Sequence, residues 1–154
     1  MKIETFLKQQ SVPFEVLPHL AEYRASRIAQ ELHVPGNNFA KTVVLNVDGK
    51  RMLAVLPASH SVNMETARDS LSADRVELAH EEELARLFPD CELGAVPPFG
   101  SQYGVETVVD EPLTADEHIV FEGNTHDQAV YMRYADFAQI EHPRVAHLSG
   151  REMN

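Results

Sequence analysis

The fold is decided by residues 39–56, FAKTVVLNVDGKRMLAVL, which hold two β-rich runs around a turn signal. The runs, residues 39–47 and 51–56, consist mainly of β-branched and other apolar side chains. Between them lies Asp48-Gly49, a dipeptide favoured in the type I′ turn of a two-residue hairpin. The pattern therefore predicts an antiparallel β-hairpin.

Lys41 is the one charged residue on an apolar face of this hairpin. Side chains alternate along a strand, so Lys41 shares its face with Phe39, Val43, Leu45 and Val47. Because a lysine is rarely buried without a partner, an ammonium group here implies a cavity, a counter-ion or an anionic ligand. Alternatively, Lys41 sits near the strand end and extends its charge to water. The sequence leaves both readings open.

The register of the hairpin suggests what lies near Lys41. With a two-residue turn, Lys41 pairs with Leu56, next to residues 57–60. Ser59 and His60 are therefore expected near the same rim as Lys41.

The rest of the chain mixes helices and strands without a steady βαβ alternation. Helices are expected at residues 2–10, 25–32, 63–71 (with Asn63 as N-cap), 81–88 and 135–140, and strands at 14–17, 75–78, 106–110, 118–121 and 129–132. This order predicts an α/β fold of the α+β type. We expect a single compact domain over residues 1–154, in which helices wrap a mixed, largely antiparallel, curved sheet.

Composition narrows the functional classes. The chain has 154 residues with 24 Asp+Glu against 13 Lys+Arg, a net charge of −11. Such a charge argues against a protein that coats nucleic acid through bulk electrostatics, and no DNA partner is expected. No apolar run approaches the ~18 residues of a membrane span, and the N-terminus does not fit a signal peptide, so we expect a cytoplasmic protein without a membrane partner.

Two loops carry residues that suit ester chemistry. In GAVPPFG, residues 94–100, glycine lets backbone N–H groups approach a ligand and proline restricts the loop, so its amides could bind an ester carbonyl or its oxyanion. The alternative is a tight structural connection. In residues 121–127, His126 could orient a substrate or exchange a proton, or it could be a solvated or structural histidine.

Other chemical motifs are missing or incomplete. HEEEL at residues 80–84 lacks the second histidine of a zincin helix, and no P-loop, GxGxxG or GxSxG occurs, so neither a metal nor a cofactor is expected. Cys91 cannot form an internal disulfide and is expected to be an unreactive thiol. The acidic stretch of residues 110–117, which begins with Asp110, is most simply a solvated surface.

Taken together, FAKTVVL at residues 39–45, GAVPPFG at residues 94–100 and the loop from Gly123 resemble the YbaK/EbsC family over nearly the whole chain. This family includes free-standing relatives of the editing domain of prolyl-tRNA synthetase. The resemblance implies a compact fold around a pocket and trans-editing, the hydrolysis of mischarged aminoacyl-tRNA. By position, Lys41 matches the important lysine of the family, and Gly94 with Pro98 matches its G-x-x-x-P loop.

Our hypothesis for the mechanism gives each of these residues a role. Lys41 holds the terminal phosphate or ribose, the 94–100 backbone binds the carbonyl, and residues 123–126 shape the amino-acid pocket. The resemblance implies in addition that the ribose 2′-OH assists the attack. The candidate catalytic residues are Lys41, Gly94 and His126, and the candidate substrate-binding residues are Thr42, Pro97, Pro98, Phe99, Gly100, Gly123, Asn124 and Thr125.

The expected partner is the aminoacylated 3′ end of a tRNA, held with help from a synthetase or from local basic residues such as Lys2, Lys8, Arg24 and Arg27. The natural substrate is a small amino acid on tRNA-Pro, because a synthetase rejects a smaller side chain only weakly. Two alternatives remain: a module that binds an aminoacyl end without hydrolysing it, and a hydrolase of another small acyl ester or thioester.

Overall fold

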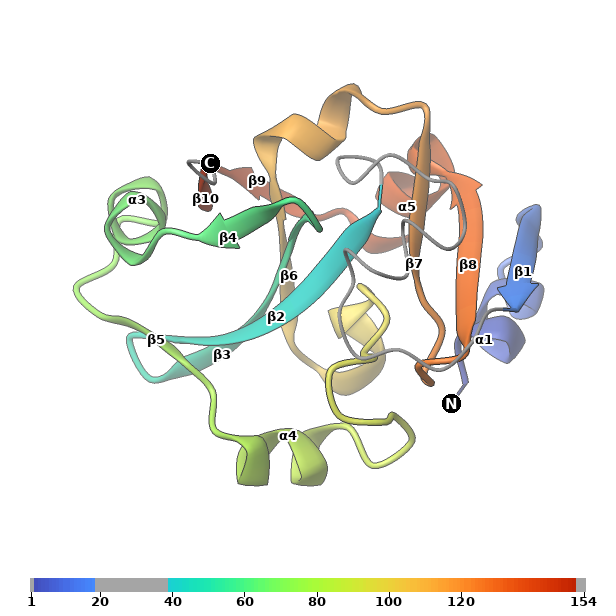
Figure 1. Cartoon of the computed structure of the whole chain (residues 1–154), viewed down its shortest axis with the longest axis horizontal. Helices are drawn as coiled ribbons and strands as arrows, with labels where there is room; N and C mark the ends of the chain where they lie inside the picture. Colours follow the sequence, from blue (N-terminus) through green and yellow to red (C-terminus); the bar gives the residue numbers. More distant parts are fainter. Residues whose placement is uncertain (1, 19–38, 152–154) are drawn as a thin grey trace.

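The hairpin predicted from residues 39–56 is present in the computed structural model, which describes residues 2–18 and 39–151 (Figure 1). Strand β2 (Ala40–Val47) pairs antiparallel with β3 (Lys50–Pro57), and Lys41 faces Leu56 as expected. Asp48 and Gly49 have φ values of 50° and 83°, and a type I′ turn requires positive φ at both positions. The register and the turn are therefore confirmed.

A five-stranded mixed sheet is built on this hairpin in the order β5-β2-β3-β6-β9. The added strands are β5 (Val76–Leu78), β6 (Glu106–Asp110) and β9 (Arg144–Ala146). Strand β2 is antiparallel to β3 and β5, whereas β6 runs parallel to β3 and to β9. The carboxyl ends of β3 and β6 thus lie at one edge of the sheet, together with the start of β2.

Two smaller antiparallel sheets complete the β structure. One has the order β1-β8-β7, from Phe14–Pro18, Gln128–Arg133 and His118–Glu122, and a bridge between Phe39 and Val120 connects it to the end of β2. The other pairs β4 (His60–Val62) with β10 (Ser149–Arg151). The sequence predicted β5 but not β4, β9 and β10, since a strand of three residues shows little alternating pattern.

Helices lie around these sheets. They are α1 (Ile3–Gln9), α3 (Met64–Ser70), α4 (Glu81–Leu87) and α5 (Tyr134–Glu141), with 3-10 turns η1 (Gly100–Tyr103) and η2 (Glu111–Ala115). Asn63 Oδ1 accepts the Thr66 N–H at 3.0 Å, so the predicted N-cap of α3 is confirmed. The helix expected at residues 25–32 lies outside the described residues. Among the helices that the structure describes, none is long and apolar enough to cross a bilayer.

The largest apolar cluster lies between the five-stranded sheet and the β1-β8-β7 sheet. Phe99 is at its centre, fully buried, with ring centroids 5.5 Å from Phe6, 5.8 Å from Phe121 and 5.2 Å from Phe137. Aromatic pairs at these separations and inclinations add to the gain from burial. Phe99 therefore anchors the loop of residues 94–100 to the core.

Candidate functional site

The loop of residues 94–100 is held rigidly by its own side chains. Gly94 is exposed and has a φ of 84°, while residues 95–100 are all buried. At Gly100, an added Cβ would lie 2.3 Å from the Val105 carbonyl oxygen, so only glycine fits there. The Gly100 N–H donates to Thr107 Oγ1 at 2.9 Å. The predicted shaped loop is confirmed, and its proline and phenylalanine side chains are packed inside the protein.

The second predicted loop, residues 123–127, is attached directly to the first. The Asn124 N–H donates to the Ala95 carbonyl at 3.1 Å, and the Asn124 carbonyl accepts the Glu92 N–H at 2.7 Å. Asn124 Oδ1 also accepts the Ile3 N–H at 2.9 Å, which brings the start of α1 to the same place. The two loops therefore form one unit, although about thirty residues separate them in the chain.

His126 fastens this unit from inside. Its side chain is 1% exposed, with Nε2 at 2.5 Å from the Leu93 carbonyl and Nδ1 at 3.0 Å from Glu122 Oε1. An added Cβ on Gly94 would lie 3.5 Å from His126 Cε1, so the ring packs beneath the exposed glycine. Both ring nitrogens contact protein atoms, and this geometry makes His126 a buried clasp between the loops.

The protonation of this pair follows from its geometry. A carbonyl oxygen can only accept, so His126 Nε2 carries a hydrogen, and one further proton is shared between Nδ1 and Glu122. Burial raises the pKa of Glu122 to about 7, against the opposing effect of His126. Burial alone would lower the pKa of His126, but its bonds to Leu93 and Glu122 outweigh this and raise it.

Lys41 lies at the sheet edge, on the other side of β2 from the loop pair. Ala40 packs in the cluster of Phe99 and Val44 packs against Val96, whereas Val43 packs in the cluster of Leu45. By alternation, Thr42 lies on the face of the loop and Lys41 on the opposite face. Lys41 Nζ is 3.5 Å from the Ala58 carbonyl, in the segment expected from the register.

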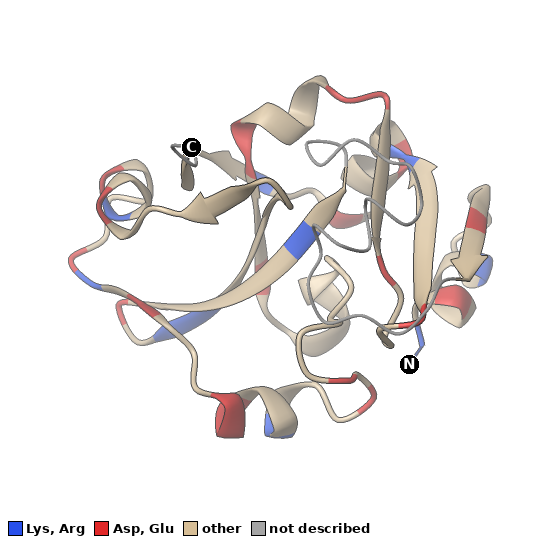
Figure 2. Ribbon diagram, viewed as in Figure 1, with Lys and Arg blue, Asp and Glu red and all other residues tan. Residues whose placement is uncertain are grey.

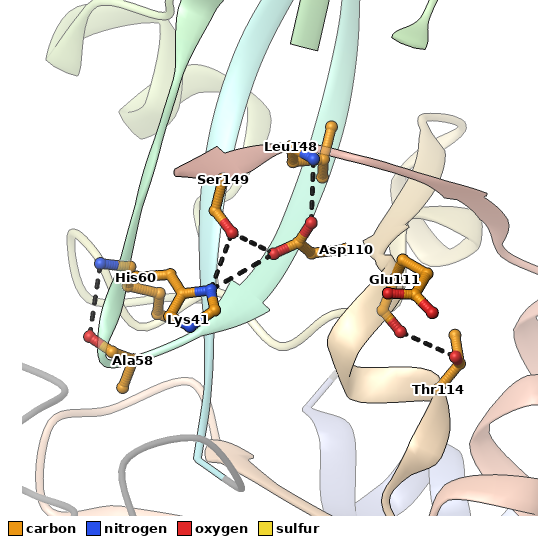
Figure 3. Close-up of polar contacts among 8 residues, drawn as sticks. All are labelled: Lys41, Ala58, His60, Asp110, Glu111, Thr114, Leu148 and Ser149. Carbon is orange, nitrogen blue, oxygen red and sulfur yellow. Dashed lines mark hydrogen bonds and ion pairs between the residues drawn. The ribbon is translucent and has the colours of Figure 1, made fainter. Parts of the chain in front are cut away.

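His60, Asp110 and Ser149 form a polar group at the same edge, and Figure 3 shows their side chains pointing toward one another. Asp110 is 1% exposed and accepts the Leu148 N–H at 2.8 Å and the Ser149 hydroxyl at 2.5 Å. The prediction that the acidic stretch from Asp110 is solvated is wrong for this residue, because residues 148–149 fold over the end of β6. An acid directly after two buried valines was the signal that could have indicated it.

The remaining candidates have simpler environments. Thr125 is half-buried, and its hydroxyl donates to Asp127 Oδ1 at 2.6 Å. Gly123 lies in the turn between β7 and β8. Burial raises the pKa of the Cys91 thiol, which supports the expectation of an unreactive cysteine. Within the part of the chain that the structure describes, no group of His, Cys, Asp and Glu side chains is arranged to hold a metal ion.

Solved structures share this fold. A hypothetical protein superposes with a TM-score of 0.85 and 19% identity, over 96% of this chain and 99% of that protein. A protein described as a candidate trans-editing enzyme for prolyl tRNA synthetase superposes with a TM-score of 0.77 and 20% identity, over 89% of this chain and 87% of the other.

Sequence comparison finds relatives among much longer proteins. The proline–tRNA ligase of Geobacillus thermodenitrificans is 28% identical over 116 residues, which are 73% of this chain and 20% of the ligase. The ligase of Bacillus cytotoxicus is 32% identical over 84 residues, 54% of this chain and 15% of the ligase. The chain thus spans about a fifth or less of these relatives. The model of the aminoacyl-tRNA editing domain matches residues 19–140, a segment that contains Lys41 and both loops, and the chain therefore belongs to this family.

Proposed function

We propose that this chain is an aminoacyl-tRNA deacylase that acts in trans, hydrolysing the ester of a mischarged tRNA to a free amino acid and tRNA. Membership of the editing-domain family supports this, since the matched segment runs through the strand of Lys41 and the two joined loops. Further support comes from relatives that are proline–tRNA ligases and from the similar fold of the candidate trans-editing enzyme.

The observation that carries the proposal is the joined loop pair with Gly94 exposed at its tip. An aminoacyl ester is already activated, so the protein needs to hold it, stabilise the developing oxyanion and admit water. Backbone N–H groups can do this when their positions are fixed before the substrate binds. Phe99 and the His126 clasp fix the loop, so the exposed backbone near Gly94 can donate a hydrogen bond to the carbonyl oxygen of the ester.

Lys41 has a separate role in this proposal. As an ammonium group at the sheet edge, it holds the terminal phosphate or ribose of the tRNA, while the ester lies against the loop pair. Thr42 follows Lys41 in β2 and, by alternation, lies on the face of the loop. A synthetase is a further candidate partner that would hold the rest of the tRNA.

The proposed substrate is a small amino acid on tRNA-Pro. A synthetase site discriminates by only about 1–3 kcal/mol per methylene, so alanine, serine and cysteine are the natural errors for a second site to remove. A cavity of about 80 Å³ beside Gly94, lined by apolar side chains such as Leu84, Phe88 and Val96, supports a small side chain.

The test is deacylation of a panel of labelled mischarged tRNAs, including Ala-, Ser- and Cys-tRNA-Pro, by wild type, Lys41→Ala and Lys50→Ala. Lys50 is exposed at the start of β3, directly after the hairpin turn, and its variant serves as a matched control for the loss of a lysine. We expect wild type and Lys50→Ala to hydrolyse at least one substrate, and Lys41→Ala to lose about ten- to a hundredfold, since a bond to a charged group is worth about 1.5–3 kcal/mol. Binding without turnover by wild type would replace the deacylase with a binding module.

A further inference from the structure

The exposed tip of the loop pair is a β-turn of residues 92–95. The Ala95 N–H donates to the Glu92 carbonyl at 3.0 Å, and Gly94, with a φ of 84°, occupies the third position, where a positive φ favours glycine. The Glu92 N–H donates to the Asn124 carbonyl at 2.7 Å, so the first residue of the turn is fixed as well. The backbones of Glu92 and Gly94 are therefore held close together in one rigid turn.

His126 determines which way the central peptide of this turn points. The Leu93 carbonyl points inward, to His126 Nε2 at 2.5 Å. The peptides of the described chain are all trans, and in a planar trans peptide the N–H points opposite to the carbonyl. The Gly94 N–H therefore points away from the buried ring, and it has no hydrogen-bond partner among the residues that the structure describes. This N–H is the donor that suits the ester carbonyl of the proposed substrate.

Glu92 brings a negative charge to the same place. It is the one charged residue among the described residues that line the cavity of about 80 Å³ beside Gly94. Most of the other lining side chains are apolar. The thiol of Cys91 is already engaged, since Sγ lies 3.3 Å from Asn124 Nδ2 and 3.4 Å from the Tyr103 hydroxyl. A cationic group at this cavity therefore has Glu92 as its acceptor.

The Glu92 carboxylate is available for this purpose. Its side chain is exposed, and the carboxylate has no hydrogen bond or ion pair with any residue that the structure describes. It nevertheless lies close enough to the clasp to act on it: burial is the main cause of the raised pKa of Glu122, and the negative charge of Glu92 adds to it. An acid that stands unpaired beside the loop tip attracts a cationic ligand group.

We infer that Glu92 recognises the α-ammonium group of the aminoacyl ester, its carboxylate accepting a hydrogen bond from this group. The inference rests on the proposed function. The α-carbon of the substrate carries three groups, and each has a contact here: the carbonyl with the Gly94 N–H, the side chain with the apolar cavity and the ammonium with Glu92. The ammonium and the carbonyl oxygen are attached to neighbouring carbon atoms, and their acceptor and donor belong to one turn. A simple acyl ester or thioester has no ammonium group, so Glu92 makes the site selective for esters of amino acids.

The test compares two substrates that differ only in this group. The mischarged tRNA that wild type hydrolyses fastest is paired with the same tRNA carrying the matching α-hydroxy acid, in which a neutral hydroxyl replaces the ammonium. Both are assayed at about pH 6, where the amino group is charged, with wild type, Glu92→Gln and Glu82→Gln. Glu82 is exposed on α4, and its variant controls for the loss of one negative charge.

The expected loss is confined to one combination of variant and substrate. Glu92→Gln should lose about three- to tenfold in kcat/KM on the aminoacyl ester, as for a charged hydrogen bond at an exposed residue, and less than about twofold on the hydroxyacyl ester. Glu82→Gln should behave as wild type on both esters.

The outcomes separate the two proposals. If wild type hydrolyses none of the mischarged tRNAs, the proposed function fails and the role of Glu92 falls with it. If wild type is active and Glu92→Gln matches it, or loses equally on both esters, only the role of Glu92 is overturned. A measurement on the unmodified protein guards against a misfolded variant. Relative to the rates without enzyme, wild type should accelerate the aminoacyl ester at least about threefold more than the hydroxyacyl ester, and equal acceleration would refute recognition of the ammonium group.

Discussion

The clasp between Glu122 and His126 makes the stability of the protein depend on pH near neutrality. The pKa of Glu122 rises from 4.5 to about 7 because the carboxyl is buried, and the pKa of His126 is also raised above its usual value. The folded pair therefore binds more protons than the unfolded pair from about pH 4.5 to above pH 7. Since the folded state holds the excess protons, the free energy of unfolding must fall as the pH rises through this window.

The structural reason for this fall is the number of protons that the pair shares among the Leu93 carbonyl, His126 Nδ1 and the Glu122 carboxylate. Below this window, hydrogens are available for both contacts of His126, to Leu93 and to Glu122. After the shared proton leaves, Nε2 keeps its hydrogen for Leu93, and a bare Nδ1 lone pair faces a carboxylate. At about 1.4 kcal/mol per pH unit for one proton, Glu122 alone sets a ceiling of about 3 kcal/mol on the loss.

The measurement is urea unfolding between about pH 5 and pH 8 for wild type, Glu122→Gln and Glu117→Gln. Glutamine cannot titrate, and its amide can donate to Nδ1 of a neutral His126. Between pH 5 and pH 8 we therefore expect the free energy of unfolding of Glu122→Gln to fall by about 2–3 kcal/mol less than that of wild type. Glu117 is exposed, and its variant should follow wild type. Parallel curves for wild type and Glu122→Gln would refute the role of the clasp.

Two further predictions concern the loop of residues 94–100 and are measured by urea unfolding. Gly100→Ala should lower the free energy of unfolding more than Gly104→Ala. The added Cβ at position 100 would lie 2.3 Å from a carbonyl oxygen, and this crowding costs about 1–3 kcal/mol. The Cβ at position 104 meets open space, so only the strain of a φ of 69° remains, which costs about 1 kcal/mol. Equal losses in the free energy of unfolding would show that the loop can rearrange to accept the added Cβ. Phe99→Ala should cost about 3–5 kcal/mol, because the ring is fully buried among three others, and a loss below about 1 kcal/mol would contradict its place in the core.

The sequence predicted what depends on local pattern. Asp48-Gly49 determined the hairpin register, which correctly placed Lys41 opposite Leu56, and Asn63 marked the start of α3. Apolar spacing predicted α1, an N-cap residue predicted α3 and acidic residues in the first turn predicted α4. These signals are contained within a few residues, so no knowledge of distant contacts was needed.

Contacts between distant segments could not be predicted in this way. The burial of His126 depends on Leu93, and that of Asp110 on residues 148–149, which approach only after the sheets have formed. Alternation assigned Lys41 to a face of β2, but not the layer that covers each face, and so the loop pair was not expected on the other side. What a strand faces depends on the tertiary fold rather than on its own pattern.

Within the proposed function, the distribution of charge favours recognition of a tRNA by its end rather than along its backbone. Acidic residues are distributed over many of the helices, strands and loops in Figure 2. Three arginines of the five-stranded sheet form ion pairs with acids: Arg51 with Glu83 at 3.5 Å, Arg75 with Glu77 at 2.6 Å and Arg144 with Glu106 at 4.0 Å. A protein that neutralises many phosphates needs clustered cations that are free to do so. The proposed site depends instead on the backbone near Gly94 and on one ammonium group at Lys41. In the proposed function these groups contact only the ester and the last nucleotide, so a further partner is needed for specificity toward the whole tRNA, and a synthetase is the proposed candidate.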